Sequence, residues 1–142
     1  MREIRFRAWD KENKEMLKVE RLWWEDGRQE LVVQTTQYTD YFNTNDMVLM
    51  QFTGLYDKNK VPIYEGDIVK YFENECAYIH YDENRMAWGI KPIDREVYFD
   101  SPYLSDNTNI EVIGNIYDNP DLLGEWNNGR KENNNSNRYG RI

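Results

Sequence analysis

Aromatic residues outnumber alanines by 21 to 3 in this chain of 142 residues, and this ratio constrains the fold more than any other feature of the sequence. Aromatic and β-branched side chains favour strands, whereas alanine is the strongest helix former. A chain of this length buries enough apolar surface to form a core without disulfides or structural metals. The composition therefore predicts a mainly β protein of one domain or two very small ones.

The distribution of apolar residues divides the chain into three parts. Residues 3–9 alternate apolar and polar, with the period of two that a half-buried strand shows. We predict an N-terminal β-rich subdomain over residues 1–46. Residues 47–124 are predicted to form a small, partly open β-barrel, since short strands interrupted by glycines suit such a barrel. Residues 125–142 are rich in asparagine and are predicted to form a disordered tail.

The segment of residues 77–90 predicts a hairpin whose register follows from its turn. Residues 82–85 are typical of a turn, and closing them there pairs Tyr81 with Met86. The other pairs then follow by counting outwards along the two strands. The face predicted to pack in a core carries Ala77, Ile79, Tyr81, Met86, Trp88 and Ile90.

Cys76 and His80 are the only cysteine and the only histidine of the chain. One of each excludes an internal disulfide and a zinc site made of cysteine and histidine alone. On a strand the two residues share a face, but four residues separate their α-carbons by about 13 Å. That distance is far beyond hydrogen-bond reach, so we do not expect a cysteine–histidine nucleophile.

The acidic residues show no pattern typical of a metal site or a catalytic centre. Asp57-Lys58-Asn59 resembles the start of a calcium loop, but Pro62 and Ile68 stand where such a loop needs glycine and glutamate. Glycine-rich phosphate loops and the common hydrolase motifs are also missing from the sequence. We therefore expect no catalysis, no metal and no cofactor.

The net charge of −8 argues against nucleic acid as the main partner, because phosphate contacts need a positive surface. One local strip is an exception. Arg5, Arg7 and Trp9 lie on one face of the first predicted strand, where they would form a basic and aromatic nucleic-acid strip. A solvated strand face is the more frequent explanation of such charges.

The sequence contains no apolar run of the roughly 18 residues that span a bilayer, and its amino end lacks the apolar core of a signal peptide. We expect a cytoplasmic protein with no membrane partner.

Three separated motifs resemble the YopX family of phage and prophage proteins. They are Arg2-Glu3-Ile4-Arg5-Phe6-Arg7-Ala8-Trp9-Asp10; Met50-Gln51-Phe52-Thr53-Gly54-Leu55, running on to Tyr64-Glu65-Gly66-Asp67-Ile68-Val69; and Glu111-Val112-Ile113-Gly114-Asn115-Ile116-Tyr117. The resemblance covers residues 2–123. It departs at Lys60-Val61-Pro62, where family members often carry a glycine in the loop.

The resemblance implies an origin in a phage or prophage of a Gram-positive host and a small barrel similar to SH3-like folds. It implies no activity, and no functional residue is carried over from it. The residues of the shared motif, Gly54, Gly66, Asp67 and Gly114, all have structural roles that suffice to explain them. Gly66 is expected to adopt a positive φ, and Asp67 to accept hydrogen bonds from nearby backbone N–H groups.

For function, we expect a non-enzymatic phage accessory protein that acts through protein–protein contacts, as a homo-oligomer. Tyrosine and tryptophan are favoured at protein interfaces, and several aromatic residues gather before residue 47. These side chains fit equally well in a core. They are Trp23, Trp24, Tyr38, Tyr41 and Phe42. A nucleic-acid-binding module that uses the Arg5, Arg7 and Trp9 strip is the alternative.

Overall fold

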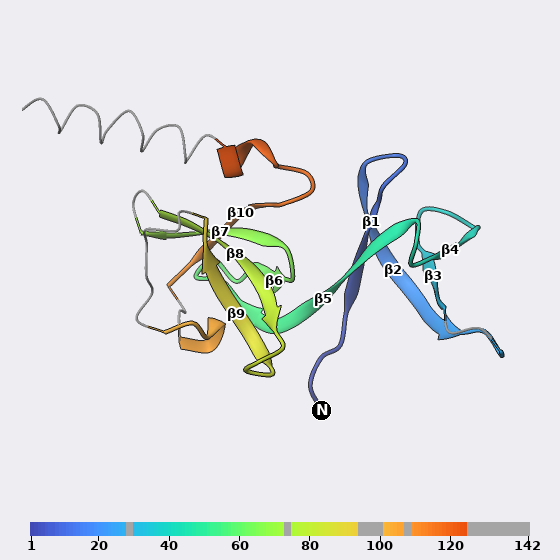
Figure 1. Cartoon of the computed structure of the whole chain (residues 1–142), viewed down its shortest axis with the longest axis horizontal. Coiled ribbons are helices and arrows are strands. Elements are labelled where there is room, and N and C mark those ends of the chain that lie inside the picture. Colours follow the sequence, from blue (N-terminus) through green and yellow to red (C-terminus); the bar gives the residue numbers. More distant parts are fainter. Residues whose placement is uncertain (28–29, 73–74, 94–100, 107–108, 125–142) are drawn as a thin grey trace, which may run out of the picture. The chain divides into compact units, whose positions relative to one another are not determined.

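The computed structural model describes residues 1–27, 30–72, 75–93, 101–106 and 109–124. These residues form two antiparallel sheets with ten strands, shown in Figure 1, a short 3-10 helix, Leu104–Asp106, and a helical turn over residues 121–124. The prediction of a mainly β fold is confirmed. The predicted disordered tail, residues 125–142, lies outside the described residues.

The larger sheet contains the first six strands. Its strand order is β4-β3-β2-β1-β5-β6. The strands are β1 (Phe6–Asp10), β2 (Glu15–Trp24), β3 (Leu31–Thr35), β4 (Tyr41–Asn43), β5 (Met47–Tyr56) and β6 (Pro62–Tyr64). Contacts between residues place this sheet in a first compact unit, made of Met1–Leu55 and Pro62–Glu65.

One face of this sheet forms a small core. Ala8, Leu17, Val33 and Met47 are all at most 2% exposed and contact one another from four different strands. Because side chains alternate along a strand, the neighbours of these residues point to the opposite face. Further apolar side chains pack against this cluster at its margin, namely Val19, Leu22, Phe42 and Leu49.

The smaller sheet belongs to a second unit, made of Tyr56–Val61 and Gly66–Ile142. Its order is β10-β7-β8-β9. The strands are β7 (Asp67–Phe72), β8 (Glu75–Asp82), β9 (Ala87–Pro92) and β10 (Glu111–Asn115). Its buried apolar side chains include Ile68, Val69, Ala77, Ile79, Ile90, Leu104 and Ile110.

The observed units differ from the predicted boundary at residue 46. The strand predicted to open the barrel, β5, pairs with β1 along Met47 to Gln51, and so belongs to the first unit up to Leu55. A run of apolar residues indicates a buried strand but not which strand it joins. Neither sheet closes into a barrel within the described residues, and the SH3-like barrel stays a prediction.

The β8–β9 hairpin forms with a register two residues away from the predicted one. Tyr81 pairs with Trp88 and not with Met86. A shift of two preserves which residues share a face, so the predicted face is kept for the remaining residues. The prediction of a core position was wrong for Met86, which is 80% exposed and has a φ of 51° in the turn, and for Tyr81, which is 45% exposed near the end of the hairpin.

Candidate functional site

Arg7 and Trp9 of the predicted strip lie on β1 and Arg5 directly precedes it, but the three residues differ in accessibility. The Arg5 guanidinium lies over the Phe52 ring, 4.3 Å from its centroid, and the Arg7 guanidinium lies 4.7 Å from the centroid of Tyr64. Arg7 also donates a hydrogen bond to the carbonyl oxygen of Glu65, at 3.1 Å. Trp9 is only 8% exposed, so its ring is not available for stacking on a base. The structure therefore brings the Arg5 and Arg7 side chains of the predicted strip together, whereas Trp9 is buried and does not form part of an exposed strip.

A groove opens beside these arginines, where β1 and β2 separate. The register between the two strands runs from Asp10–Glu15 to Arg7–Lys18 and stops there. β1 goes on pairing with β5 as far as Phe6, and β2 goes on pairing with β3 as far as Trp24. Figure 1 shows the two strands diverging from this point.

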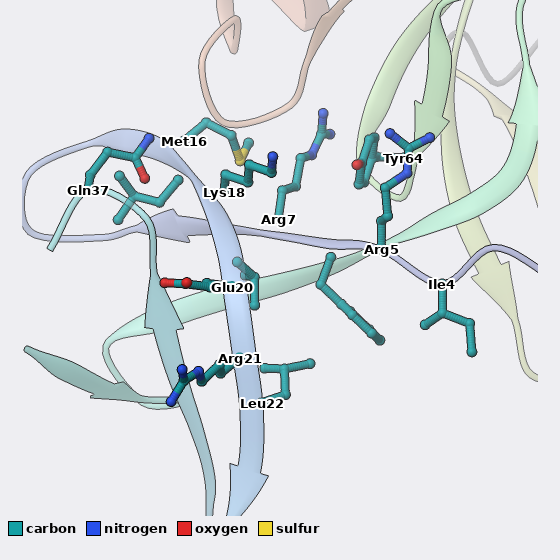
Figure 2. A pocket seen from close by; sticks show the side chains of 13 residues that line it. Ile4, Arg5, Arg7, Met16, Lys18, Glu20, Arg21, Leu22, Gln37 and Tyr64 are labelled. Atoms are coloured by element: carbon teal, nitrogen blue, oxygen red, sulfur yellow. The ribbon is translucent and has the colours of Figure 1, made fainter. Parts of the chain in front are cut away.

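We call this opening the strand groove. It has a volume of about 620 Å³, and Figure 2 shows the side chains around it. Its apolar lining comes from both strands. It is formed by Ile4, Arg5, Phe6, Arg7, Met16, Leu17, Lys18, Val19, Glu20, Arg21 and Leu22, together with Gln37 and Tyr64.

The charges around the strand groove are mainly positive, although the chain as a whole is acidic. Arg7 and Lys18 occupy opposite positions in the β1–β2 register, so their side chains project from the same face. Arg5 and Arg21 add two further cations, and Glu20 is the one carboxylate in the lining. Glu3 lies outside the lining and forms an ion pair with Arg5, at 2.9 Å. A positive groove attracts anionic groups.

A second surface lies on β2, β3 and β4, and we call it the aromatic patch: Arg21, Trp23, Gln34 and Tyr41. Arg21 pairs with Gln34, and Gln34 pairs with Tyr41, so the three form one row across the strands. The Trp23 and Tyr41 rings meet edge to face, with centroids 5.0 Å apart. A hollow of about 560 Å³ lies among these residues. Tyr41 is 63% exposed on β4, which is an outer strand of the sheet.

The structure divides the other aromatic residues of this region between core and surface. Phe42 packs against the core cluster, whereas Trp24 is 68% exposed. Tyr38 packs edge to face on Phe42 and donates a hydrogen bond to the carboxylate of Glu15, which raises the pKa of Tyr38. The sequence left open whether these residues form a core or an interface, and both occur.

The residues of the shared motif occupy backbone positions with special requirements. Gly54 has a φ of 85° and Gly66 a φ of 82°, in the left-handed region that favours glycine. A side chain on Gly114 would begin 2.5 Å from the Oδ1 atom of Asn119. Asp67 is 2% exposed and pairs with Asn115 across the second sheet. The positive φ predicted for Gly66 is confirmed.

Cys76 and His80 lie on β8, on the strand that their predicted separation assumed. Burial raises the pKa of the Cys76 thiol to about 11, so the sulfur is protonated at neutral pH. The His80 ring lies against Gly89 on β9, with Nε2 2.7 Å from the place a β-carbon would take. A protonated, buried thiol is a poor nucleophile.

The carboxylate of Asp57 is occupied by backbone groups of its own unit. Its Oδ1 accepts hydrogen bonds from the N–H of Asn59 at 2.8 Å and of Val61 at 2.9 Å. Its Oδ2 accepts one from the N–H of Val112, at 2.9 Å. Within the part of the chain that the structure describes, no three His, Cys, Asp or Glu side chains gather as metal ligands would.

Sequence reasoning missed the strand groove and the row of the aromatic patch. The groove depends on the strand lengths that the structure shows, 10 residues in β2 against 5 in β1, and the sequence pattern did not indicate this difference. A long strand beside a short one must leave part of its edge to another partner or to solvent. The row of Arg21, Gln34 and Tyr41 depends on the register between β2, β3 and β4, which the sequence did not indicate.

The two sheets and the basic groove define a small, mainly β protein. The chain belongs to the YopX family, because residues 5–124 match the model of that family, described as YopX protein. It is similar to the crystal structure of protein EF1440 from Enterococcus faecalis, with 29% sequence identity and a TM-score of 0.61. That similarity covers 87% of this chain and 99% of the other. No curated protein matches the chain.

None of the helical segments in the described ranges is long and apolar enough to cross a bilayer.

Proposed function

We propose that this chain is a non-enzymatic phage or prophage accessory protein of the host cytoplasm that acts through protein–protein contacts, first of all with a second copy of itself. The observation that carries the proposal is the aromatic patch. Arginine, tryptophan and tyrosine are the residue types most enriched at the energetic centres of interfaces, and here all three lie on one exposed face.

The position of the patch at an outer strand favours self-association. β4 is at the end of the sheet order, so in the described residues one of its edges has no strand partner. Such an edge pairs readily with another strand. Two copies related by a twofold axis would place β4 against β4 and bring Tyr41 of each copy near the same residue of the other.

The test compares the chain with a Tyr41→Ser variant by sedimentation velocity over a range of concentrations. We expect the wild type to form dimers as its concentration rises, and the variant to need about tenfold more protein or beyond, since an interface tyrosine often contributes more than 1 kcal/mol. The matched control is Tyr81→Ser. Tyr81 is 45% exposed and meets Trp88 edge to face at 5.3 Å, much as Tyr41 meets Trp23.

A wild type that stays monomeric at every concentration removes self-association from the proposal. Capture experiments from phage-infected host cells, with wild type and Tyr41→Ser as bait, then test for another protein partner. If no protein depends on Tyr41 for capture, the aromatic patch is not a contact surface.

Nucleic-acid binding by Arg5 and Arg7 is a second candidate, and the specific observation in its favour is the third cation, Lys18, placed opposite Arg7. It predicts binding to oligonucleotides that weakens steeply with salt and disappears in the Arg5→Glu/Arg7→Glu double variant. Absence of binding to single- or double-stranded DNA and RNA at low salt contradicts it. The buried ring of Trp9 already removes base stacking on that residue.

A further inference from the structure

We propose that the strand groove binds an extended, acidic segment of a partner protein, which adds to the free edge of β2 as a further strand. The strand groove shares Arg21 with the aromatic patch, but its other residues and its occupant differ, and the inference goes beyond the function proposed above. Three observations carry the inference. They are the orientation of the backbone groups where β1 and β2 separate, the open edge of β2, and the positive charge of the side chains at the rim of the strand groove.

Where β1 and β2 separate, backbone groups of both strands point into the strand groove. The carbonyl oxygen of Arg5 accepts a hydrogen bond from the N–H of Phe52, so Arg5 turns its backbone groups towards β5. Because the direction alternates along a strand, the N–H and C=O of the next residue, Phe6, face β2. In the same way, the carbonyl of Lys18 accepts from the N–H of Thr36, so the groups of Val19 face β1.

The pair that would come next in the register, Phe6 with Val19, is not formed. Pairing between β1 and β2 ends one step earlier, at Arg7–Lys18. Beyond that point β2 pairs with β3 alone, from Val19 to Trp24. Within the described residues this half of β2 therefore has one free edge, and that edge borders a groove of about 620 Å³. A free edge of this length is what strand addition requires.

The side chains of the groove select the chemistry of the occupant. Phe6, Val19 and Leu22 are half-buried, and their exposed parts offer apolar contacts to an added strand. Val19 and Leu22 share a face although they are three positions apart, because a β-bulge lies between Val19 and Arg21. Lys18 and Arg21 are exposed on the same strand, and Arg7 faces Lys18, so the rim favours carboxylates. An extended segment that alternates apolar and acidic residues matches both features. A nucleic acid matches only the charge, since it has no strand edge.

The experiment measures binding of a labelled nine-residue peptide that alternates valine and glutamate to the full chain, by fluorescence anisotropy. One control peptide carries lysine in place of glutamate. Another keeps every side chain but has N-methyl groups on alternate backbone nitrogens, which removes its ability to pair as a strand. We expect saturable binding of the first peptide alone, and protection of the β2 amides from hydrogen exchange when it is bound.

Two variants of the chain test the location. Lys18→Glu is expected to weaken binding of the acidic peptide roughly two- to tenfold, because it reverses an exposed charge on the rim. Lys91→Glu is the control, an exposed lysine on β9 in the second unit. Tyr41→Ser is expected to bind the peptide like the wild type, so this proposal and the proposed function fail or succeed separately.

Three results would overturn the inference. If the N-methylated peptide binds as tightly as the unmethylated one, the groove attracts the peptide by charge and no strand is added. Lack of saturation with the acidic peptide up to about 1 mM shows that the edge does not accept a strand. Binding of an oligonucleotide that is lost in Lys18→Glu, with no binding of the peptide, assigns the rim to nucleic acid.

Discussion

Gly66 and Asp67 stand next to each other at the start of β7, and we predict a structural role for both. The N–H of Gly66 donates to the carbonyl of Ile79 at 2.8 Å, and its carbonyl accepts from the N–H of Ile116 at 2.9 Å. The residue thus joins three segments of the second unit while its φ is positive. Asp67 is buried beside it. We therefore expect both residues to be fold determinants.

Gly66→Val is expected to lower the melting temperature clearly. A β-carbon in the left-handed region costs about 1–2 kcal/mol, out of a total stability of about 5–15 kcal/mol for a small domain. Thermal unfolding by circular dichroism measures the change. Gly124→Val is the control, since Gly124 has no positive φ and open space around it, and it should melt like the wild type.

Asp67→Ala is expected to destabilise the chain by about 1–3 kcal/mol, because removal of a buried carboxylate leaves its partner groups without hydrogen bonds. Thermal unfolding again measures the effect. A ligand-binding role predicts the opposite, near-normal melting with loss of binding. An unchanged midpoint would therefore refute the structural role of this residue.

At the scale of single residues, the sequence predicted the backbone conformation of Gly66 but not the burial of Trp9. The turn at Gly66 follows from glycine chemistry alone, and it was predicted. Trp9 was assigned to an exposed strip because it shares a face with Arg5 and Arg7, yet it is 8% exposed. A period of two indicates which residues share a face, but not which parts of that face are covered by distant segments.

Three turns of this protein share one design, in which an aspartate at the end of a strand holds the loop that follows. In each, an aspartate oxygen accepts a hydrogen bond from the backbone N–H two residues later. Each loop also contains a residue other than glycine with a positive φ. The aspartates are Asp10, Asp57 and Asp82, and the residues with positive φ are Lys14, Lys60 and Met86. Several of the acidic residues are therefore parts of turns.

This design explains the error in the β8–β9 register. The predicted turn closed the hairpin before Met86, whereas Met86 itself adopts the left-handed conformation and Asp82 pairs with Ala87. Left-handed residues are usually glycine or asparagine, so nothing in the sequence indicated that a methionine would take this position. The strands and their faces were predictable, and the loop length was not.

Lys60→Gly is expected to raise the melting temperature. The φ of Lys60 is 63°, and the strain of about 1–2 kcal/mol that a side chain has there exceeds the cost of about 0.5–1 kcal/mol for glycine flexibility. The control is Asn59→Gly in the same loop, which has no positive φ to relieve and should melt earlier. If both variants lose stability equally, the backbone of Lys60 is not strained.

The Asp10 turn is expected to make stability depend on pH. Hydrogen bonds from the Asn13 side chain, and then from the backbone N–H groups of Asn13 and Glu12, lower the pKa of Asp10 below its ordinary value of 3.8, while burial opposes them. A carboxylate with a lowered pKa stabilises the fold fully above that ordinary value. This contribution is lost as the pH falls through the lower pKa of the folded state.

Asp10→Asn should therefore be less stable than the wild type at neutral pH, and the difference should narrow below the ordinary value of 3.8. Melting curves from neutral pH to about pH 2 measure it. Glu12→Gln, an exposed change in the same loop, serves as the control. A difference that stays constant over this range contradicts an ionic role for Asp10.

Over the whole molecule, segments of the first and second units alternate along the chain. The first unit is completed by Pro62–Glu65, and the second unit takes Tyr56–Val61 from between the parts of the first. Strand content was predictable from local patterns. The unit to which each strand belongs depends on contacts such as Phe6 with Gln51, 45 positions away. Pairings at such separations leave no periodic trace in the sequence.

A fragment of residues 1–46, the subdomain that the sequence predicted, is therefore expected not to fold. It lacks β5, the partner of β1, and Met47 of the core cluster. A fragment of residues 1–65 retains every strand of the larger sheet and is expected to show more strand structure. Circular dichroism and the dispersion of amide resonances measure the difference. Well-dispersed resonances from residues 1–46 would show that the core closes without β5.

The alternation of segments between residues 55 and 66 also limits how a gene for such a protein could be recombined. A single crossover before Pro62 takes β6 away from the first unit, and one after Glu65 separates Tyr56–Val61 from the second. No single point in this region yields two intact halves. Exchange between related genomes is therefore expected to move both units together, so that their sequences share one ancestry along the whole length of the chain.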